Sequence, residues 1–503
     1  MIQSPYQKNL NLKRIGVYYF LIIAGGCTTG LITCLVTGMN LKWFVVYLLG
    51  ILMLLLFALY RQQRRLALGL FVFFIPFFVG KQLFSSGYPL ISGGPSAIGI
   101  FLYDIPLVFL ILYLFKERVF QRDTSIYLPP VFLPFVLYII WCGISMVKSA
   151  EPVLTIIEFV WFCRMAVILI VLVNLVKDKS DLILVLSVLI AGLFVQELVT
   201  FIQAYFKTWF TFTGNVEHTT LQSTTKPEVF RAGGTIGVHN VQAAYYVLLI
   251  SLTTGIYFIT QNIKLKLVLF LVISGGLLSV LLSYSRNGYL SLVSALTIVL
   301  FFGWRKKYIN IKHLIAGAWL ILFSAFFVYY MFGGESIIER IKSKAAIDPR
   351  MEGIYISLNM IQQNPFAGVG LNNYSIVMGD RNYSPEGISN TQKGYFGGEF
   401  FGTVVHNKYL LVASETGIVG LIFFIWTHFI IFLYAFKLLK SRDKLYWGIG
   451  AGMIAALTGA SIQMLFSIYN ADLLITVYWV LVGLIFVSYK ISIQEEKNLC
   501  LEA

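Results

Sequence analysis

Runs of about 20 apolar residues, separated by short basic connectors, set the strongest limit on how this chain can fold. About 20 helical residues cross the hydrocarbon core of a bilayer, and the backbone groups of such a segment must bond to each other within the helix. Fourteen segments fit this description. They are residues 15–38, 43–60, 66–84, 97–115, 129–147, 153–176, 182–206, 239–261, 266–284, 287–304, 313–332, 408–436, 445–467 and 472–489.

The composition excludes the common classes of soluble chain. Apolar residue types make up 58% of the 503 residues, and charged types make up only 12%. A soluble globular chain carries about 25% charged residues. Soluble enzymes, disordered proteins and fibrous repeats are therefore excluded, and we expect an all-α polytopic membrane protein with about 14 transmembrane helices.

The basic residues predict which side of the membrane each connector faces. Most of the 38 Lys and Arg residues fall in the inner connectors when the N-terminus is placed inside. Short cytoplasmic connectors carry such an excess. The pattern therefore predicts an even number of spans with both termini cytoplasmic, and the net charge of +15 does not indicate nucleic-acid binding.

Two outer connections are much longer than the rest, and they divide the chain. The expected parts are transmembrane helices 1–7 in residues 1–206, a first outer loop at 207–238, helices 8–11 in 239–332, a large outer catalytic loop at 333–407, helices 12–14 in 408–489 and a cytoplasmic tail at 490–503. Loops of this length inside a compact protein usually carry function or are disordered.

The large outer loop is expected to contain an amphipathic helix on the outer membrane surface. Asp348, Pro349 and Arg350 have the pattern of an N-cap followed by the first two helical residues. The apolar residues of the predicted helix then recur at helical spacing, and Pro365 lies beyond its end. They are Met351, Ile354, Leu358 and Ile361.

Charged residues inside predicted spans are the first candidates for chemistry. Asp104 lies in the fourth span, Glu158 and Arg164 in the sixth, and Glu197 in the seventh. Such groups serve transport in pumps and transporters, but an Arg can also pair with a carboxylate and fix helix packing. We favour the structural interpretation for each of them.

A second group of candidates converges on the outer face. Arg231 and His239 close the first large loop, Arg286 follows a very short outer turn, Arg350 opens the amphipathic helix and His406 closes the second large loop. Arginine suits bidentate phosphate recognition, and neutral histidine can accept a proton. A helix N-terminus beside an Arg favours an anion, so we expect a pyrophosphate to be held by cations and backbone amides.

Each candidate also has a structural interpretation. Arg286 could extend to the membrane interface, while Ser285 could cap the following helix. His239 with Asn240, and His406 with Asn407, could also serve only as helix caps. The outer Asp and Glu residues lack the spacing of a hard-metal site, so no metal and no cofactor are expected.

Four stretches in order carry a resemblance to a known family. They are RAGGTIGVHN (231–240), LSYSRNGYLSL (282–292), RMEGIYISLNMIQQNPFAGVGLNNY (350–374) and VHNKYLLVASETGIVGLIFF (405–424). Together they resemble the O-antigen ligase and O-antigen polymerase superfamily of bacterial envelope glycosyltransferases. The resemblance covers about residues 200–430, and the first six spans match only as apolar helices.

The resemblance implies a GT-C-like, metal-independent, inverting glycosyltransferase of the bacterial inner membrane. Its donor would be a glycan on undecaprenyl pyrophosphate, its acceptor a glycan or a glycolipid such as lipid A–core, and its active site would lie on the periplasmic face. Carried over by position, Arg231 and Arg286 would bind the donor pyrophosphate, and Arg350 would help to hold it or would order the loop. His406 would be the base or would stabilise the leaving group. Arg350, His239, Asn407 and Tyr409 would complete the substrate site. The family often has twelve spans, so the two additional helices have no assigned role.

Three functions remain open from the sequence. The first is a glycan transferase, either a ligase or a repeat-unit polymerase. The second is a lipid-linked glycan flippase or transporter, which the sparse intramembrane charge disfavours. The third is a scaffold for envelope assembly, which leaves the two large loops without a purpose.

Overall fold

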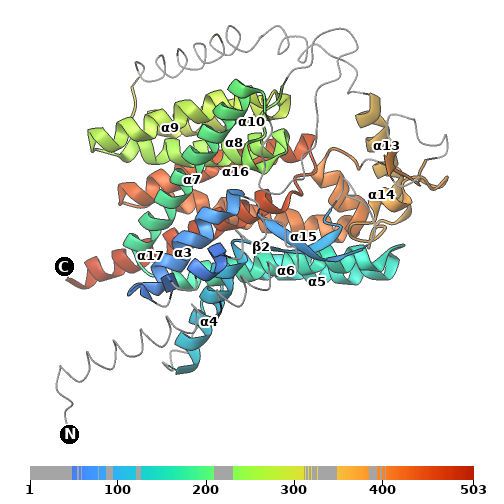
Figure 1. Ribbon diagram of the computed structural model, residues 1–503, viewed down its shortest axis with the longest axis horizontal. Helices are drawn as coiled ribbons and strands as arrows, with labels where there is room; N and C mark the ends of the chain where they lie inside the picture. The colour runs from blue at the N-terminus through green and yellow to red at the C-terminus, as the bar shows by residue number, and fades with distance from the viewer. Residues whose placement is uncertain are drawn as a thin grey trace.

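Long helices dominate the computed structural model of the chain (Figure 1). The structure describes residues 48–53, 56–57, 59–77, 79–86, 94–120, 126–208, 230–310, 348–384, 393–396, 399–402 and 404–502, together with Gly26, Lys312, Ile315, Trp319 and Phe326.

Eight helices in these ranges are long and apolar enough to cross a membrane. They are α6 (Pro152–Leu175), α7 (Lys179–Phe206), α8 (His239–Ile259), α9 (Ile263–Leu282), α10 (Arg286–Arg305), α15 (Lys408–Leu438), α16 (Lys444–Phe466) and α17 (Asp472–Glu502). Each coincides with a predicted span, and the chain is an all-α polytopic membrane protein. The predicted total of fourteen is not confirmed, because the spans at 15–38 and 313–332 and part of 43–60 fall outside the described residues.

Polar residues at the helix starts explain where several of these helices begin. The side chains of Asp178, Asn262, Ser285, Asn407 and Asp443 each accept a bond from a backbone N–H in the first turn of the helix that follows. Such caps satisfy donors that the helix itself leaves unbonded. The predicted caps at Ser285 and Asn407 are therefore present.

The N-terminal part differs from the prediction. Helix α3 (Gln63–Phe74) ends in a 3-10 turn that contains Pro76, and a hairpin of β1 (Gly80–Ser85) and β2 (Ala97–Phe101) follows. The predicted spans at 66–84 and 97–115 are thus each part helix and part strand. Proline cannot continue the helical bonding, and a short apolar run does not distinguish a strand from a helix.

Two shorter helices complete this region. Helix α4 (Asp104–Phe120) follows the hairpin, and α5 (Phe132–Ser145) runs into a 3-10 turn at Met146–Lys148. The region at 129–147 is therefore a short apolar helix, below the length of the eight candidate spans.

The centre of the bundle forms around α8, α16 and α17, which are the most buried of the candidate spans. Helices α8 and α16 pack closely because small residues face each other: a Cβ at Gly255 would collide with the carbonyl oxygen of Gly448 and would lie 2.8 Å from the nitrogen of Gly452. Small residues allow the backbones of membrane helices to approach, and dispersion then holds the helices together.

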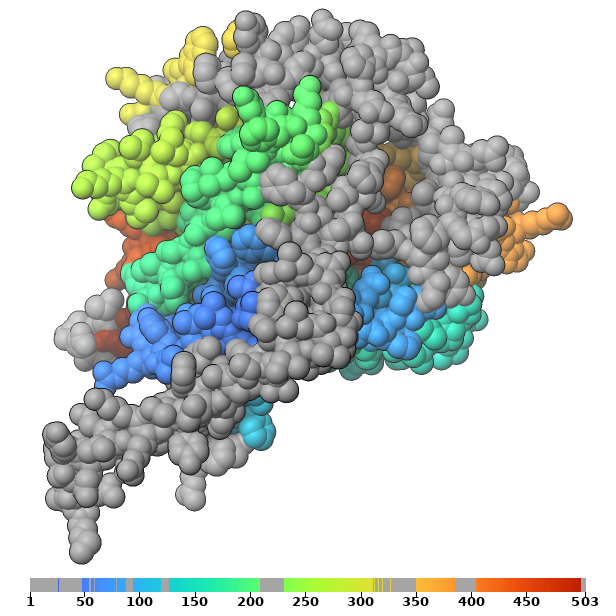
Figure 2. Space-filling view, in the orientation of Figure 1, coloured from blue at the N-terminus to red at the C-terminus, as the bar shows by residue number. Residues whose placement is uncertain are grey.

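The outer loop forms a small structure of its own at one end of the bundle. It contains α13 (Asp348–Gln363), the single-turn α14 (Tyr374–Val377) and a hairpin of β3 (Lys393–Phe396) and β4 (Glu399–Gly402). Helices α13 and α14 lie at the end opposite the C-terminus (Figure 1). In the space-filling view the orange part of this loop projects beyond the helices (Figure 2).

Helix α13 is present as predicted, and residues outside the predicted apolar line pack against the protein. Ile356 and Met360 pack into an apolar cluster with Tyr374, whereas Met351 and Leu358 of the predicted apolar line are exposed. The sequence shows apolar residues on both sides of the helix, and contact with α15 decides which side is covered.

Two of the last helices depart from the predicted boundaries. Helix α15 is broken at Gly417, whose φ of 72° and ψ of −178° are not helical. The ring of Tyr409, before the break, packs edge-on against Phe424, after it, with centroids 6.0 Å apart, so the first turns fold back. Helix α17 continues to Glu502, so the predicted tail at 490–503 is helical up to that residue.

The substitution Gly255→Ala should destabilise the bundle by about 1–3 kcal/mol, because the added methyl group forces two backbones apart. Thermal unfolding in detergent would measure the effect. Gly69→Ala is the matched control, since its Cβ would meet a Val188 methyl group at an ordinary 3.9 Å. Equal unfolding midpoints for the two variants would contradict the close α8–α16 contact.

Candidate active site

Arg231 holds the short turn that precedes α10. Its side chain is buried, and its Nε donates to the carbonyl oxygen of Ser283 at 3.0 Å. Its Nη2 donates to the carbonyl oxygen of Tyr284 and to Oδ1 of Asn240, both at 3.3 Å. The guanidinium therefore joins the first outer loop, the start of α8 and the 283–285 turn.

That turn presents Arg286 at the first position of α10. Ser285 caps the helix through Oγ, which accepts from the backbone N–H of Gly288 at 3.2 Å. Tyr284 has a positive φ of 52°, which lets the chain reverse sharply. Arg286 thus stands where the backbone N–H groups and the dipole of α10 both favour a negative charge.

Two glutamines that the sequence analysis did not select fix the first outer loop. Gln203 Oε1 accepts from the backbone N–H of Gly234 at 2.8 Å, and Gln196 Nε2 donates to Thr235 Oγ1 at 2.6 Å. Both glutamines are fully buried in α7. Their spacing of seven residues on one side of an apolar helix is the signal that could have revealed them.

Arg350 and His406 lie close enough to these groups for their charges to interact. Burial lowers the pKa of Arg350, and the positive charge of Arg286 lowers it further. The surrounding protein limits the hydration of the His406 ring and so lowers its pKa, and repulsion by Arg350 acts in the same direction. Arg286, Arg350 and His406 are therefore neighbours in space, although they come from α10, α13 and the end of the outer loop.

His406 is an exposed residue between two buried anchors. Val404 and Val405 are each only 2% exposed and belong to the apolar cluster beneath α13. On the other side Oδ1 of Asn407 accepts from the backbone N–H of Leu410 at 3.0 Å and so caps α15. The side chain of Lys408, the next residue, is buried. His406 thus remains accessible beside two buried neighbours, within electrostatic reach of Arg350.

The Phe-Ala-Gly-Val-Gly turn follows α13 in the chain and packs against α15. The backbone N–H groups of Val369 and Gly370 donate to the carbonyl oxygens of Ser414 and Glu415, both at 2.9 Å. Gly368 and Gly370 have φ of 67° and 99°, which is a conformation that favours glycine. The predicted helix-exit turn is present, and it also docks on the break in α15.

The Asn-Asn-Tyr that follows ties the same turn to α6. Asn373 Oδ1 accepts from the backbone N–H of Glu151 at 2.7 Å, and its Nδ2 donates to Thr155 Oγ1 at 3.1 Å. The Tyr374 hydroxyl donates to the carbonyl oxygen of Gly353 in α13 at 2.9 Å. These residues, which the sequence motif contains, hold the outer loop in place.

The remaining predicted site residues have structural contacts. His239 is the first residue of α8 and is buried, beside the Asn240 that Arg231 contacts. Val238, and not His239, occupies the cap position there. The hydroxyl of Tyr409 donates to the carbonyl oxygen of Ser461 in α16 at 3.4 Å, and Asn407 Oδ1 is engaged in capping.

Arg164 forms the ion pair that the structural interpretation expected. Its Nη2 lies 2.5 Å from Oδ1 of Asp104, and its Nη1 lies 3.7 Å from Oδ2 of Asp472. The guanidinium also lies over the ring of Tyr103, 4.8 Å from its centroid. This cluster joins α4, α6 and α17 within the bundle.

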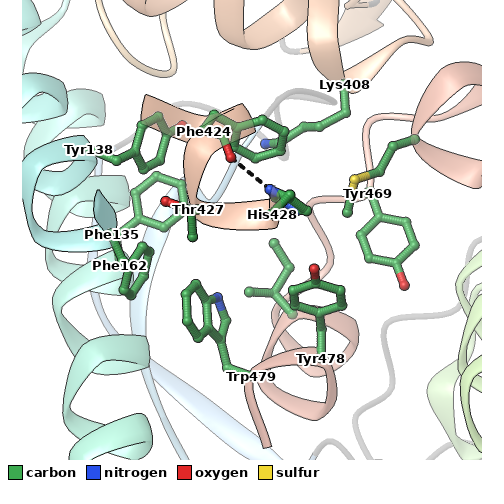
Figure 3. A pocket seen from close by; sticks show the side chains of 12 residues that line it. Phe135, Tyr138, Phe162, Lys408, Phe424, Thr427, His428, Tyr469, Tyr478 and Trp479 are labelled. Atoms are coloured by element: carbon green, nitrogen blue, oxygen red, sulfur yellow. Dashed lines mark hydrogen bonds between the residues drawn. The ribbon is translucent and has the colours of Figure 1, made fainter. Parts of the chain in front are cut away.

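Glu158 belongs to a second buried group of charged side chains, which also contains Lys408 and Glu415. Glu158 in α6 and Glu415 in α15 both act electrostatically on Lys408, and all three side chains are under 5% exposed. Lys408 Nζ donates to Oδ1 of Asn470, in the connection between α16 and α17. Lys408 also reaches an apolar cavity that contains the ring of His428 (Figure 3).

Residues 267–425 match the family model described as O-antigen ligase. This stretch of the chain resembles an O-antigen ligase domain. The matched stretch contains Arg286, Arg350 and His406, while Arg231 and His239 precede it. No curated protein matches the chain in sequence. The predicted superfamily is confirmed, and it places the chain among ligase-like or polymerase-like membrane enzymes of glycosyl transfer.

The substitution Arg231→Met should lower stability by about 1–3 kcal/mol, because buried carbonyl groups of the 283–284 turn lose their charged donor. Thermal unfolding in detergent measures the change. Arg381→Met, at an exposed position in the outer loop, is the control for loss of an arginine. If both variants unfold at the same temperature, Arg231 does not hold the turn.

Proposed function

We propose that this chain transfers a glycan from undecaprenyl pyrophosphate to a glycan or glycolipid acceptor. The observation that carries the proposal is the meeting of Arg286, Arg350 and His406, three residues that lie far apart in the sequence. All three fall within the stretch that matches the O-antigen ligase family. We take a ligase as the first candidate and a repeat-unit polymerase as the second.

The arginines suit a pyrophosphate leaving group. Burial lowers the pKa of Arg350, and repulsion by the Arg286 charge lowers it further. A bound anion removes this repulsion and accepts charge-assisted hydrogen bonds from both side chains. Arg231 is engaged with the 283–284 turn, so in this proposal it holds Arg286 in position and adds positive charge. The arginines thereby stabilise the negative charge that develops on the leaving group, without a metal.

His406 suits the role of general base. Its pKa lies below that of an ordinary histidine, so the ring is neutral at neutral pH and can accept a proton. The acceptor hydroxyl would give its proton to His406 while its oxygen attacks the anomeric carbon. The bond from that carbon to the pyrophosphate oxygen breaks, and undecaprenyl pyrophosphate leaves. Attack in line with the leaving group inverts the anomeric centre.

The arrangement of the bundle supports a site on the periplasmic face of the inner membrane. Helices α13 and α14 lie at the end opposite the C-terminus (Figure 1), and basic inner connectors predict a cytoplasmic C-terminus. A GT-C-like fold, and a substrate role for His239, Asn407 and Tyr409, are further parts of this proposal. A flippase is the alternative from another class, and it would tolerate the loss of His406.

A reconstituted assay tests the reaction. Purified protein receives undecaprenyl-pyrophosphate-linked repeat units, with and without lipid A–core. Lengthening glycans from donor alone identify a polymerase, and product that requires the acceptor identifies a ligase. We expect His406→Ala to lower turnover by about 100-fold or more, the usual contribution of a positioned base, and Arg286→Ala to abolish transfer.

Control variants show whether these losses are specific. Both variants must reach the membrane and unfold at the temperature of the unmodified protein, and Arg381→Ala must retain activity. Normal turnover by both His406→Ala and Arg286→Ala would refute the site. Movement of the donor across the membrane without a glycosidic product would favour the flippase.

The pH dependence tests the electrostatics of His406. Its active form is neutral, so kcat/KM should rise with pH and level off above a midpoint that lies below the ordinary pKa of histidine. Arg350→Gln removes a charge that opposes protonation of the ring. The midpoint should therefore move to higher pH, whereas Arg381→Gln should leave it in place. A midpoint unaffected by Arg350→Gln would show that the two residues do not interact.

A further inference from the structure

The buried cluster of Glu158, Lys408 and Glu415 lies directly behind the residue proposed as the base. Lys408 is the second residue after His406, and its side chain turns inward while His406 remains accessible. Its ammonium donates to Asn470 and interacts with the two carboxylates. A lysine is rarely buried to this degree unless it is paired. These contacts therefore fix the position of the Lys408 side chain.

Each partner of Lys408 comes from a different part of the structure. Glu158 belongs to α6, and Asn470 belongs to the connection between α16 and α17. Glu415 accepts from the backbone N–H groups of Asn372 and Tyr374, in the turn that follows α13. Lys408 therefore joins the start of α15 to the segment that also places Arg350.

The two carboxylates do not have equivalent surroundings. Neither oxygen of Glu158 has a hydrogen-bond partner among the described residues, and a Cβ at Gly94 would lie against both Glu158 Oε2 and Asn372 Oδ1. Lys408 is thus the cation that compensates the Glu158 charge electrostatically. Loss of one partner from a buried ion cluster is costly, because the remaining charge has no compensation.

The chain between residues 404 and 408 is held at both ends. Val404 and Val405 are fixed in the apolar cluster, and Lys408 is fixed in the charged cluster. His406 lies between the two anchors, so the backbone that carries its ring can shift only if one anchor is released. Displacement of a reacting group by about 1 Å can cost about 100-fold in rate.

We propose that Lys408 is a positioning residue, which aims His406 toward Arg350 by anchoring the start of α15 to Glu158, Glu415 and Asn470. This inference rests on the proposed function for its effect on turnover. Its effect on the orientation of His406 does not depend on any particular substrate.

The decisive variant replaces the whole cluster by neutral side chains of similar shape, Lys408→Met with Glu158→Gln and Glu415→Gln. It removes the anchor without leaving a buried charge uncompensated. We measure the rate at which diethyl pyrocarbonate modifies His406 as a function of pH, by mass spectrometry of the peptide that contains it. Only the neutral ring reacts, so the midpoint of this profile reports the pKa of His406.

We expect the midpoint to move toward the ordinary value for histidine, because the released ring leaves the positive field of Arg350. In the transfer assay, kcat should fall by about 10-fold to 100-fold, while the donor KM should change by less than about 3-fold. Lys444→Met is the matched control, since Lys444 is also the first residue of a membrane helix but is exposed. It should alter neither measurement.

Asn470→Ala is a second variant, for the case in which the triple variant does not fold. It removes the acceptor of the Lys408 ammonium, leaves the three charges in place and should move the His406 midpoint in the same direction by a smaller amount. An unchanged modification profile in the triple variant, or in Asn470→Ala if only that variant folds, would overturn the proposal. If the unmodified protein shows no transfer activity, the proposed function fails, and the modification profile still decides the role of Lys408.

Discussion

The candidate site depends on a set of backbone hydrogen bonds between the turn after α13 and the break in α15. The backbone N–H groups of Val369 and Gly370 donate to carbonyl oxygens of residues that precede Gly417. The backbone N–H of Ile418, which follows Gly417, donates to the carbonyl oxygen of Pro365. A Cβ at Gly417 would lie 2.8 Å from the nitrogen of Ala367, besides colliding with Phe366. The break thus opens backbone groups that an unbroken helix would bond internally, and the outer turn bonds to them. This contact fixes α13, and with it Arg350, relative to the segment that carries His406.

The site has two halves, which are held by different sets of contacts. Arg231 and the buried glutamines of α7 hold the half that presents Arg286. The outer turn and the charged cluster around Lys408 hold the half that presents Arg350 and His406. Arg286 and Arg350 repel each other across this junction, so closer approach of the halves is costly until an anion lies between them.

The sequence could predict features that depend on neighbouring residues but not those that depend on distant partners. Apolar runs predicted the eight long helices, and short polar side chains predicted the caps at Ser285 and Asn407. The start of α13 followed from Asp348 and Pro349. The buried side of α13 could not be predicted, because apolar residues lie on both sides and α15 selects between them. The strand at Gly80–Ser85 was missed because its apolar run is also compatible with a helix. The convergence of the arginines on one face was predicted from the sidedness of the loops, and only the fold shows which of them are neighbours.

The segment VHNKYLLVASETG shows why a motif can be specific although few of its residues are accessible. His406 is exposed, while Val405, Lys408, Ser414 and Glu415 are buried and bind other parts of the fold. In the proposed mechanism these residues contribute through the position that they give to His406. Substitution of a buried member should therefore change the direction and the surroundings of the imidazole before it changes the composition of the site. One set of residues thus supplies the charged groups of the site, and a second set of buried residues places them. A sequence comparison that considers only the arginines and the histidine would miss the buried residues.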